Sequence, residues 1–422
     1  MVNSAIDVIE SRPELIKSLG RVGLVVNQAS TTQKYKPSVE AFARAASRVD
    51  GTTLACLFGP QHGYGQTEQD NMIETGDGFF ALSDGRKLPL YSLYSKTRIP
   101  TPEQLADVDT LVVDLQDIGC RVYTYMLTLA GCMRSAAQLN KRVVVLDRPN
   151  PIGLSQPNRR GSFTQGNCLD MAWQSFVGWY PIPMRHGLTM GELGHFFMNY
   201  DQLKLDYEVI PVEGLKRTTS VNELSRLPWT IPSPNLPTWT TAFCFPAFVA
   251  LETTTLSEGR GTTLPFQTVG APHFPVQKIQ EALKTWNETA PRQFRFCGLN
   301  MREHCFRPTF NKSQSQICQG IQFHPVELEE NNLMALGAVF LTLASCEFND
   351  FDWKAPGYEY NFTDPPVHLV LGHSQWKSFL DSIKGSTWNS SVQNSLIELL
   401  HWSEDDAQKF ELTYENCHIY HS

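Results

Sequence analysis

The first 150 residues alternate between two hydrophobic periods, and this alternation restricts the fold more than any other feature of the sequence. Short apolar runs rich in Val and Leu alternate with longer stretches of helical spacing, such as 37–49 and 123–140. Strand, helix and strand in this order predict a parallel sheet covered by helices on both faces. In open sheets of this kind, ligands bind beyond the carboxyl ends of the strands. The expected strands lie at 21–28, 52–59, 88–94, 109–117 and 141–149.

The length of the chain predicts about two domains, because 422 residues exceed one ordinary hydrophobic core. Four prolines within ten residues, at 228, 232, 234 and 237, are unfavourable for a helix or a central strand. We therefore expect one α/β domain over residues 1–232 and a second domain over residues 233–422. In the second domain we expect a strand at the start of 245–266, and helices near 275–288, 331–346, 374–385 and 389–402.

Charge and composition argue against several classes of partner. The net charge is −8 and no basic run could neutralise several phosphates, so we expect no nucleic-acid partner. No stretch approaches the ~20 apolar residues that span a bilayer, so we expect no membrane partner. The N-terminal residues lack the pattern of a signal peptide, and the ten cysteines form no C-x-x-C pair. These two features predict a cytoplasmic protein with reduced thiols.

Sequence motifs for cofactors are also missing. The loop at 59–68 has glycines but lacks the third glycine of a dinucleotide-binding loop, since Glu68 stands there. The chain contains no P-loop lysine, and its Cys and His residues have irregular spacing for a metal site. We therefore expect neither a cofactor nor a metal ion.

Compact polar groups follow several of the expected strands within two or three residues. Since the carboxyl ends of parallel strands meet at one edge, these groups predict a pocket there. They are Asn27-Gln28, Gln61-His62, Asp114 with Gln116-Asp117, and Asp147-Arg148 with Asn150.

The segment 112–125 combines carboxylates, an amide, a guanidinium and phenols. Asp114, Gln116, Asp117, Arg121 and Tyr123 together supply acceptors, donors and a stacking face for a polyhydroxylated or anionic ligand. The alternative is structural, with Asp117 capping the next helix and Arg121 paired with it.

Two further segments carry groups with the same two readings. Arg185 and His186 precede a helix whose expected capping box is Thr189 with Glu192, so His186 is either a proton carrier or a structural residue near a cap. Asp147 and Arg148 stand before two prolines, in a rigid turn that either presents them to a ligand or is purely structural.

The loop at 252–263 has the best-placed carboxylates of the second domain. It offers Glu252 and Glu258, with Arg260 between two glycines that let the backbone approach a ligand closely. The alternative is a surface hairpin with a salt-bridged glutamate. Together the residues predict a pocket at the strand ends, closed by this loop, for a polar and sugar-like small molecule.

Eight ordered motifs between about residue 20 and residue 360 resemble those of the NamZ family. They are LFGPQHG, LPLYSLYSKTRIPTPEQL, VVDLQDIGCRVYTY, VLDRPNPIG, GWYPIPMRHGLTMGEL, IPSPNLP, LSEGRGTTLPF and FRPTFNK. The resemblance implies a Rossmann-like N-terminal domain, a smaller α+β C-terminal domain and an active site in the cleft between them. It also implies an exo-β-N-acetylmuramidase that removes N-acetylmuramic acid from the non-reducing end of peptidoglycan fragments.

The same resemblance suggests how such a sugar is held. Its lactyl carboxylate requires an arginine, for which Arg121, Arg148, Arg185 and Arg260 are the candidates. Its hydroxyl and acetamido groups suit the amides and aspartates of the pocket.

Two positions depart from the family pattern. The first motif usually reads F-G-P-E-H-G, with the glutamate as leading catalytic candidate, but this chain has Gln61 there. A V-E-G-P motif usually follows D-R-P-N-P, and this chain has Arg160 near that glutamate position. A glutamine cannot exchange a proton at neutral pH, and general acid–base catalysis contributes roughly 10²–10⁴-fold.

Three explanations fit the glutamine. Another acid has taken over, either Glu68 or Asp70 in the same loop or Glu258 across the cleft. Alternatively, the acetamido group of the substrate assists the reaction and Gln61 orients it. The third explanation is a relative that binds muramic-acid sugars without turnover.

The sequence thus predicts a glycosidase with a carboxylate pair in the interdomain cleft. Glu258 and Asp117 are the preferred catalytic residues, with Glu68 in reserve. The expected substrate-binding residues are Gln61, His62, Asp114, Gln116, Arg121, Tyr123, Asp147, Arg148, Asn150, Arg185, His186, Asn235, Glu252 and Arg260.

Overall fold

A computed structural model describes residues 2–69, 72–156, 163–329 and 331–421. The N-terminal half of the chain forms a seven-stranded sheet in the order β3-β4-β2-β1-β5-β6-β9, with only the edge strand β3 antiparallel to its neighbour. The expected α/β class and parallel sheet are confirmed. The strands are β1 (Gly20–Val25), β2 (Thr52–Gly59), β3 (Gly78–Ala81), β4 (Lys87–Ser92), β5 (Thr110–Val113), β6 (Arg142–Leu146) and β9 (Tyr207–Ile210).

Helices cover both faces of this sheet, as the alternation of the sequence predicts. Along β5, Leu111 and Val113 pack on the face of α3 and α4, whereas Val112 packs on the opposite face with α1 and α2. Successive side chains of a strand point to opposite faces, so both faces of a doubly covered strand must be apolar. The helices are α1 (Ala5–Ser11), α2 (Ser38–Ala46), α3 (Tyr125–Gln138) and α4 (Met190–Asp201).

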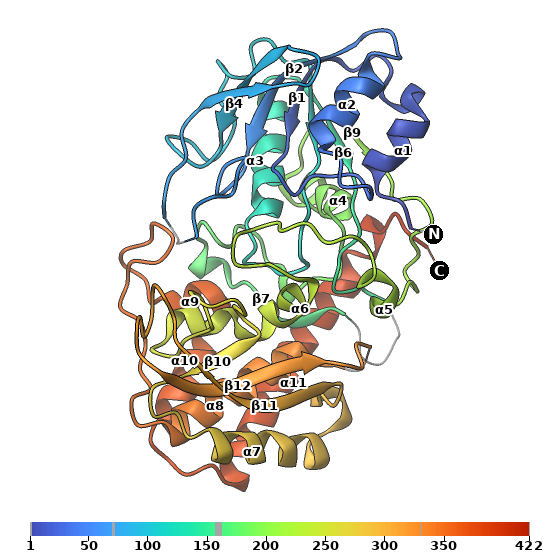
Figure 1. Ribbon diagram of the computed structural model, residues 1–422. Helices are drawn as coiled ribbons and strands as arrows, with labels where there is room; N and C mark the ends of the chain where they lie inside the picture. Colours follow the sequence, from blue (N-terminus) through green and yellow to red (C-terminus); the bar gives the residue numbers. More distant parts are fainter. Residues whose placement is uncertain (1, 70–71, 157–162, 330, 422) are drawn as a thin grey trace.

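The C-terminal half contains a smaller antiparallel sheet of three strands in the order β10-β12-β11, packed with helices (Figure 1). The four helices expected there are present, and the last is longer than predicted. The strands are β10 (Thr268–Ala271), β11 (Leu299–Phe306) and β12 (Cys318–Pro325). The helices are α6 (Trp239–Phe248), α7 (Val276–Thr289), α8 (Leu333–Glu347), α9 (Pro366–Leu371), α10 (Ser374–Ile383) and α11 (Ser390–Thr413).

The strand expected at the start of 245–266 is wrong. Residues 239–248 form α6, and Val249–Thr253 continue as a 3₁₀ helix. The run is buried on all sides, and a continuous apolar run has no period that separates a buried strand from a buried helix.

The two halves interlock. A two-stranded ribbon, β7 (Gln165–Cys168) and β8 (Pro183–Arg185), comes from the first half of the chain but packs against α11. The N-terminal half is the upper half in Figure 1 and the C-terminal half is the lower one. The C-terminal segment returns to the upper half, where the Tyr420 hydroxyl donates to Asp147 Oδ2 over 2.6 Å. The two ends of the chain therefore lie side by side, with Val2 and Tyr420 in one hydrophobic cluster. One hydrophobic core includes α3 and α8 together, so the boundary between 232 and 233 stays a prediction.

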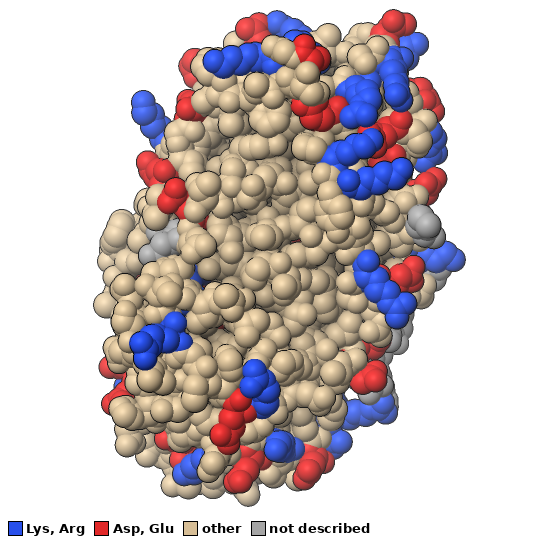
Figure 2. All heavy atoms as spheres, in the orientation of Figure 1, with Lys and Arg blue, Asp and Glu red and all other residues tan. Residues whose placement is uncertain are grey.

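Charged side chains are unevenly distributed over the surface. On the face shown in Figure 2, Lys, Arg, Asp and Glu lie mainly toward the two ends and along the right-hand edge, and the middle of the face is almost uncharged. No helix among the described residues is long and apolar enough to cross a membrane.

Candidate active site

A cavity lies between the two halves, at the carboxyl end of β2. Its walls surround about 550 Å³ of empty space, part of which is open solvent. The upper half contributes the loop after β2 and the start of α3, and the lower half contributes α6, the loop after it and the segment before α9. The polar lining residues are Gln61, His62, Tyr123, Thr124, Tyr125, Ser233, Asn235, Glu252, Arg260, Tyr358 and Glu359.

A tight turn places the first two of these residues. β2 ends at Gly59, where a Cβ atom would lie 2.9 Å from the backbone nitrogen of Tyr64, so only glycine allows the chain to fold back. His62 then adopts a left-handed backbone conformation with φ of 66°, which directs its ring to the cavity. The glycine-rich loop therefore positions Gln61 and His62 at the cavity wall.

Gln61 is buried and held on both sides of its amide. Its Oε1 accepts a hydrogen bond from Thr124 Oγ1 over 2.5 Å, and its Nε2 donates to the Tyr94 hydroxyl over 3.3 Å. The Tyr94 hydroxyl in turn donates to Glu359 Oε2 over 3.2 Å. A hydrogen-bonded chain thus runs from Gln61 through Tyr94 to a carboxyl group of the other half.

Glu359 is the carboxyl group in the cavity with the most altered acidity. It is 5% exposed. Burial, and next the negative charge of Glu252, raise the pKa of Glu359 to about 7. A group with this pKa carries a proton at neutral pH in a large fraction of molecules, which is the property of a general acid.

Glu252, the second carboxylate of the cavity, has opposite surroundings. It forms an ion pair with Arg260, and its Oε2 accepts from the Tyr358 hydroxyl over 2.8 Å. Arg260 is buried and also donates to the carbonyl of Gln69 over 3.2 Å. The cavity therefore contains one ion-paired carboxylate and one carboxyl group that favours its neutral form.

Glu258 and Lys312 support this pair from behind. Arg260 Nε lies 3.4 Å from Glu258 Oε1, and Lys312 Nζ lies 2.5 Å from Glu258 Oε2. Burial opposes ionisation of Glu258, but Lys312 and Arg260 outweigh it and hold its pKa below the usual value. Charges of alternating sign thus run from Lys312 through Glu258 and Arg260 to Glu252.

His62 is neutral in this site. Burial, and next the positive charge of Arg260, lower the pKa of His62 to about 4. Its Nδ1 atom has no hydrogen-bond partner among the described residues. A neutral imidazole with an unpaired nitrogen at a cavity wall can exchange a hydrogen bond with a ligand hydroxyl.

Two more predicted residues reach the cavity. Burial raises the pKa of Tyr123 well above its usual value, so this phenol is neutral, and its ring lies 4.7 Å from that of Tyr125. Asn235, from the proline-rich segment, donates from Nδ2 to the carbonyl of Gln69 over 2.7 Å. Of the predicted substrate-binding residues, the structure brings together Gln61, His62, Tyr123, Asn235, Glu252 and Arg260.

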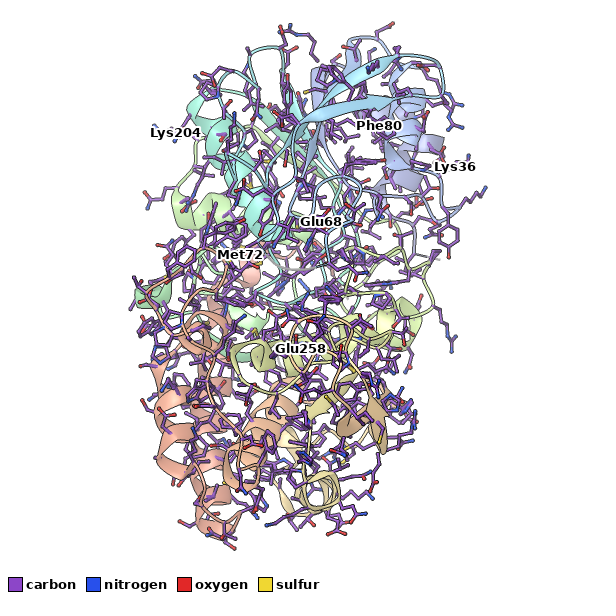
Figure 3. The ribbon with its side chains drawn as sticks, turned by 60° about the vertical axis from the view of Figure 1, so that its left-hand side comes forward. Lys36, Glu68, Met72, Phe80, Lys204 and Glu258 are labelled. Atoms are coloured by element: carbon purple, nitrogen blue, oxygen red, sulfur yellow. The ribbon has the colours of Figure 1, made fainter. Side chains whose placement is uncertain are left out.

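The three predicted catalytic carboxylates are placed differently. None of them is among the described residues that line the cavity. Glu258 is 1% exposed behind Arg260, and Glu68 is half-buried in the upper half, with the junction between them (Figure 3). Asp117 is buried, accepts from the backbone nitrogen of Gly119 over 2.6 Å and lies 3.3 Å from His186 Nε2. Asp70 and Arg160 lie outside the described residues.

The polar groups after β5 and β6 form a closed network. Arg148 donates from Nε to Asp114 Oδ1 over 2.5 Å and from an Nη atom to Asp114 Oδ2 over 3.0 Å. Asp147 accepts from the backbone nitrogen of Gly191 near the start of α4, and Asn150 bonds the carbonyl of Leu188. These four side chains are hydrogen-bonded within the protein and do not line the cavity. Arg148 instead lines a separate hollow together with Gln116 and Trp229.

The other predicted residues also hold the fold. Arg121 is fully buried and donates to the carbonyls of Asn167, Ile182 and Val370, where it ties the two halves together.

Arg185 is fully buried beside Phe163, where it bonds the carbonyl of Ile152 and the Gln165 side chain. His186 Nδ1 accepts from the backbone of Leu188, and Gln116 donates to the carbonyls of Asp117 and Pro149. The capping box of Thr189 with Glu192 is confirmed.

Sequence reasoning missed Glu359 and Tyr358. Their segment, PGYEYNF at 356–362, has a glutamate between two tyrosines in the long connection between α8 and α9. Glu359 and Tyr360 both adopt left-handed conformations, with φ of 44° and 65°, which is uncommon for residues other than glycine. The one sequence signal was the placement of a carboxylate among aromatic residues in a loop bounded by Pro and Gly.

Family models of the exo-beta-N-acetylmuramidase NamZ match the chain, the N-terminal model over residues 22–240 and the C-terminal model over residues 243–420. The peptidoglycan beta-N-acetylmuramidase NamZ of Bacillus subtilis (strain 168) is 33% identical over 405 residues, which are 95% of this chain and 87% of that protein.

Two crystal structures of DUF1343 family proteins from Bacteroides fragilis NCTC 9343 are also similar. One has a TM-score of 0.79 at 26% sequence identity, over 99% of both chains. The other has a TM-score of 0.70 at 24% identity, over 100% of this chain and 99% of that one, and it supports the fold alone.

Proposed function

Because this chain belongs to the NamZ family of exo-beta-N-acetylmuramidases, we propose that it removes N-acetylmuramic acid from the non-reducing end of peptidoglycan fragments. The protein is a glycosidase of this family, and the cavity between its halves is the site that we assign to the reaction. The observation that supports this assignment most is the pair of carboxyl groups, Glu252 and Glu359. Glu252 is paired with the positive charge of Arg260, whereas Glu359 is buried beside the negative charge of Glu252.

In this proposal Glu359 is the general acid. Cleavage of a glycosidic bond requires a proton on the oxygen that leaves, and a carboxyl group with a pKa near neutrality supplies it most effectively. Glu359 meets this requirement because burial and Glu252 raise its pKa to about 7. Glu252 remains beside it as the ion-paired carboxylate that stabilises positive charge on the sugar ring or activates water.

The glutamine at position 61 then has a positioning role. It supports the Tyr94 hydroxyl, which donates to Glu359, so the residue at the usual glutamate position acts through another acid. This arrangement favours the explanation that the acid has moved over the explanation that turnover is lost. None of the three predicted catalytic acids, Glu68, Glu258 and Asp117, has a comparable position on the cavity wall.

Arg260 is the arginine that we assign to the lactyl carboxylate of N-acetylmuramic acid. It is the one of the four candidate arginines that lines the cavity. Glu258 and Lys312 hold it in place from behind, and neutral His62 and Asn235 supply hydrogen bonds for hydroxyl and acetamido groups. We also propose a reducing compartment for the protein, since all ten cysteines are free thiols.

The test uses a disaccharide of N-acetylmuramic acid β-linked to N-acetylglucosamine. The wild type should release both monosaccharides, and kcat should fall as the pH rises above about 7, because Glu359 loses the proton that it donates. Glu359→Gln should still bind the disaccharide and lose roughly 10²–10⁴-fold in kcat.

Glu404→Gln is the matched control. Burial also raises the pKa of Glu404 to about 7, but this residue is outside the cavity lining and accepts from Asn332. It should keep the wild-type kcat and the wild-type pH profile. A wild type that binds the disaccharide without cleaving it would instead favour a sugar-binding protein, and equal losses in both variants would reject Glu359 as the acid.

A further inference from the structure

A cluster of exposed aromatic side chains lies outside the cavity, at the edge of the junction. Phe362 is 69% exposed and Tyr360 is 37% exposed, and both belong to the loop before α9 (Figure 1). With half-buried Phe176 they surround an open hollow, whose polar rim includes Ser175, Asn361 and Thr363. We call the three aromatic residues Phe176, Tyr360 and Phe362 the aromatic shelf. Exposed aromatic side chains grouped in this way are a mark of binding surfaces.

The shelf is continuous with the cavity. Glu359 lines both the cavity and the open hollow, so the carboxyl group assigned as the acid stands at the boundary of the two spaces. A ligand that extends out of the cavity past Glu359 therefore reaches the shelf next. None of the predicted site residues lies there, and the proposed reaction has not used these side chains.

Arg98 and Met72 contact the shelf from its inner side. The Arg98 guanidinium lies 4.8 Å from the ring centre of Tyr360 and 5.6 Å from that of Phe176, and it also stacks on Tyr94 at 4.3 Å. The Tyr360 backbone nitrogen contacts Met72 Sδ at 3.4 Å. Arg98 thus links the shelf to the tyrosine that supports Glu359.

The loop that carries the shelf is also closed on itself. The backbone nitrogen of Asn361 donates to the carbonyl of Tyr358 over 3.0 Å, and its Nδ2 donates to Asp364 over 2.8 Å. These contacts stabilise the left-handed conformations of Glu359 and Tyr360, which would otherwise be unfavourable. Phe362 therefore stays exposed on a fixed loop, instead of packing into the core.

We propose that the aromatic shelf binds the sugar ring on the leaving-group side of the scissile bond, a neutral pyranose such as N-acetylglucosamine. This inference rests on the proposed function. Hydrolysis breaks the bond between C1 of N-acetylmuramic acid and the bridging oxygen. Water adds to C1, and the bridging oxygen leaves with the second ring and the proton of Glu359.

The geometry of that step places the second ring. The bridging oxygen must lie within hydrogen-bond reach of the acid, so the ring attached to it lies immediately beyond Glu359. The shelf occupies that position. The faces of a pyranose carry apolar C–H groups that pack on aromatic rings, and its equatorial hydroxyls match the hydroxyls of Ser175 and Thr363 at the rim.

The test compares two substrates in Phe362→Ala. With the disaccharide, kcat/KM should fall roughly three- to tenfold, as expected for loss of one aromatic contact. With a trifluoroethyl β-glycoside of N-acetylmuramic acid, whose leaving group is small and not aromatic, kcat/KM should be unchanged. Phe362→Tyr should restore cleavage of the disaccharide. Phe79→Ala is the control, since Phe79 is 65% exposed on the remote edge strand β3.

Failure of the inference and failure of the proposed function give different results. If the wild type cleaves both substrates and Phe362→Ala affects them equally or not at all, the shelf does not bind the leaving sugar. If Phe362→Ala matters only for a disaccharide that carries a stem peptide, the shelf binds peptide and our proposal is wrong.

If the wild type cleaves neither substrate, the proposed function fails. Calorimetry then decides on the shelf, because Phe362→Ala should weaken binding of the disaccharide but not of free N-acetylmuramic acid.

Discussion

The polar groups at the end of β2 and those at the ends of β5 and β6 look alike in the sequence but differ in the fold. Gln61 and His62 line a cavity, and His62 Nδ1 has no partner among the described residues. Asp114 and Arg148 form a two-point ion pair, with the Asp114 side chain completely buried. We call the first set the open edge and the second set the closed edge.

The difference comes from partners far away in the chain. The Arg148 side chain also bonds the carbonyl of Thr31 and the hydroxyl of Ser38, which precede it by more than 100 residues. At the open edge, by contrast, the cavity lies where the lower half faces the loop after β2. At the open edge only His62 keeps an unpaired hydrogen-bonding atom among the described residues, and its place on the cavity wall makes that atom available to a ligand.

The largest effect that separates the two edges is on stability. Arg148→Met leaves the Asp114 carboxylate buried without its partner, and we expect a loss of roughly 3–5 kcal/mol in the free energy of unfolding. Gln61→Ala, at the open edge, should cost about 1 kcal/mol, since it removes neutral hydrogen bonds beside a cavity that opens to solvent. Urea denaturation of both variants measures the two values.

This comparison would break if the two variants lost similar stability. The hydrogen bonds of Gln61 would then stabilise the fold as much as the ion pair between Asp114 and Arg148. The comparison is sharpened if folded Arg148→Met cleaves the disaccharide with a wild-type KM, because Arg148 then has no contact with substrate.

The same difference explains how much could be predicted from the sequence. The parallel sheet, its helices and the capping box at Thr189 follow from local period and local chemistry, which the sequence displays directly. Strand ends could be found, but not which of them face a cavity. Arg121 illustrates the limit, since its carbonyl partners include Val370 and no pattern within 112–125 points to it.

Glu359 is the opposite case, a residue of the site that the sequence did not predict. Its role depends on burial and on Glu252, a residue that precedes it by more than 100 positions. A motif with glycine on either side of Arg260 pointed to Glu258 as a catalytic acid, but the glycines there shape the backbone behind Arg260. Gly259, for example, has φ of 80° and packs against the carbonyl of Thr268. Electrostatic context is a property of the whole fold and has no short signature.

A smaller effect should appear in the pH dependence of stability. The pKa of Glu359 is raised in the folded protein to about 7 from 4.5, so the folded state binds more protons between these values. The contribution of Glu359 is therefore fully present below about pH 4.5 and is lost as the pH rises through about 7. Glu359→Gln, which is always neutral, should gain roughly 2–3 kcal/mol in unfolding free energy relative to the wild type between pH 5 and pH 8.

Denaturation of both proteins at the two pH values measures this difference. Because only the difference between variant and wild type is used, other buried acids such as Glu192 cancel. A constant difference across the range would mean that Glu359 ionises normally, and the open edge would then have no neutral acid.

The smallest expected effect is that of Gln61→Glu, which restores the usual family residue. The new carboxylate cannot donate to Tyr94 as the Gln61 amide does, and its negative charge should raise the pKa of Glu359 further. Since Glu359 remains protonated to a higher pH, we expect the alkaline limb of the kcat profile to move upward, with kcat at pH 7 changed less than about tenfold.

The pH profile of disaccharide cleavage by this variant tests the open edge most directly. If the wild type is nearly inactive and Gln61→Glu raises kcat by two orders of magnitude or more, position 61 is where the acid belongs and Glu359 does not supply the proton. If the profile shifts upward at nearly constant kcat, the two residues act on one proton through Tyr94. The open edge is then a catalytic unit assembled from both halves of the protein.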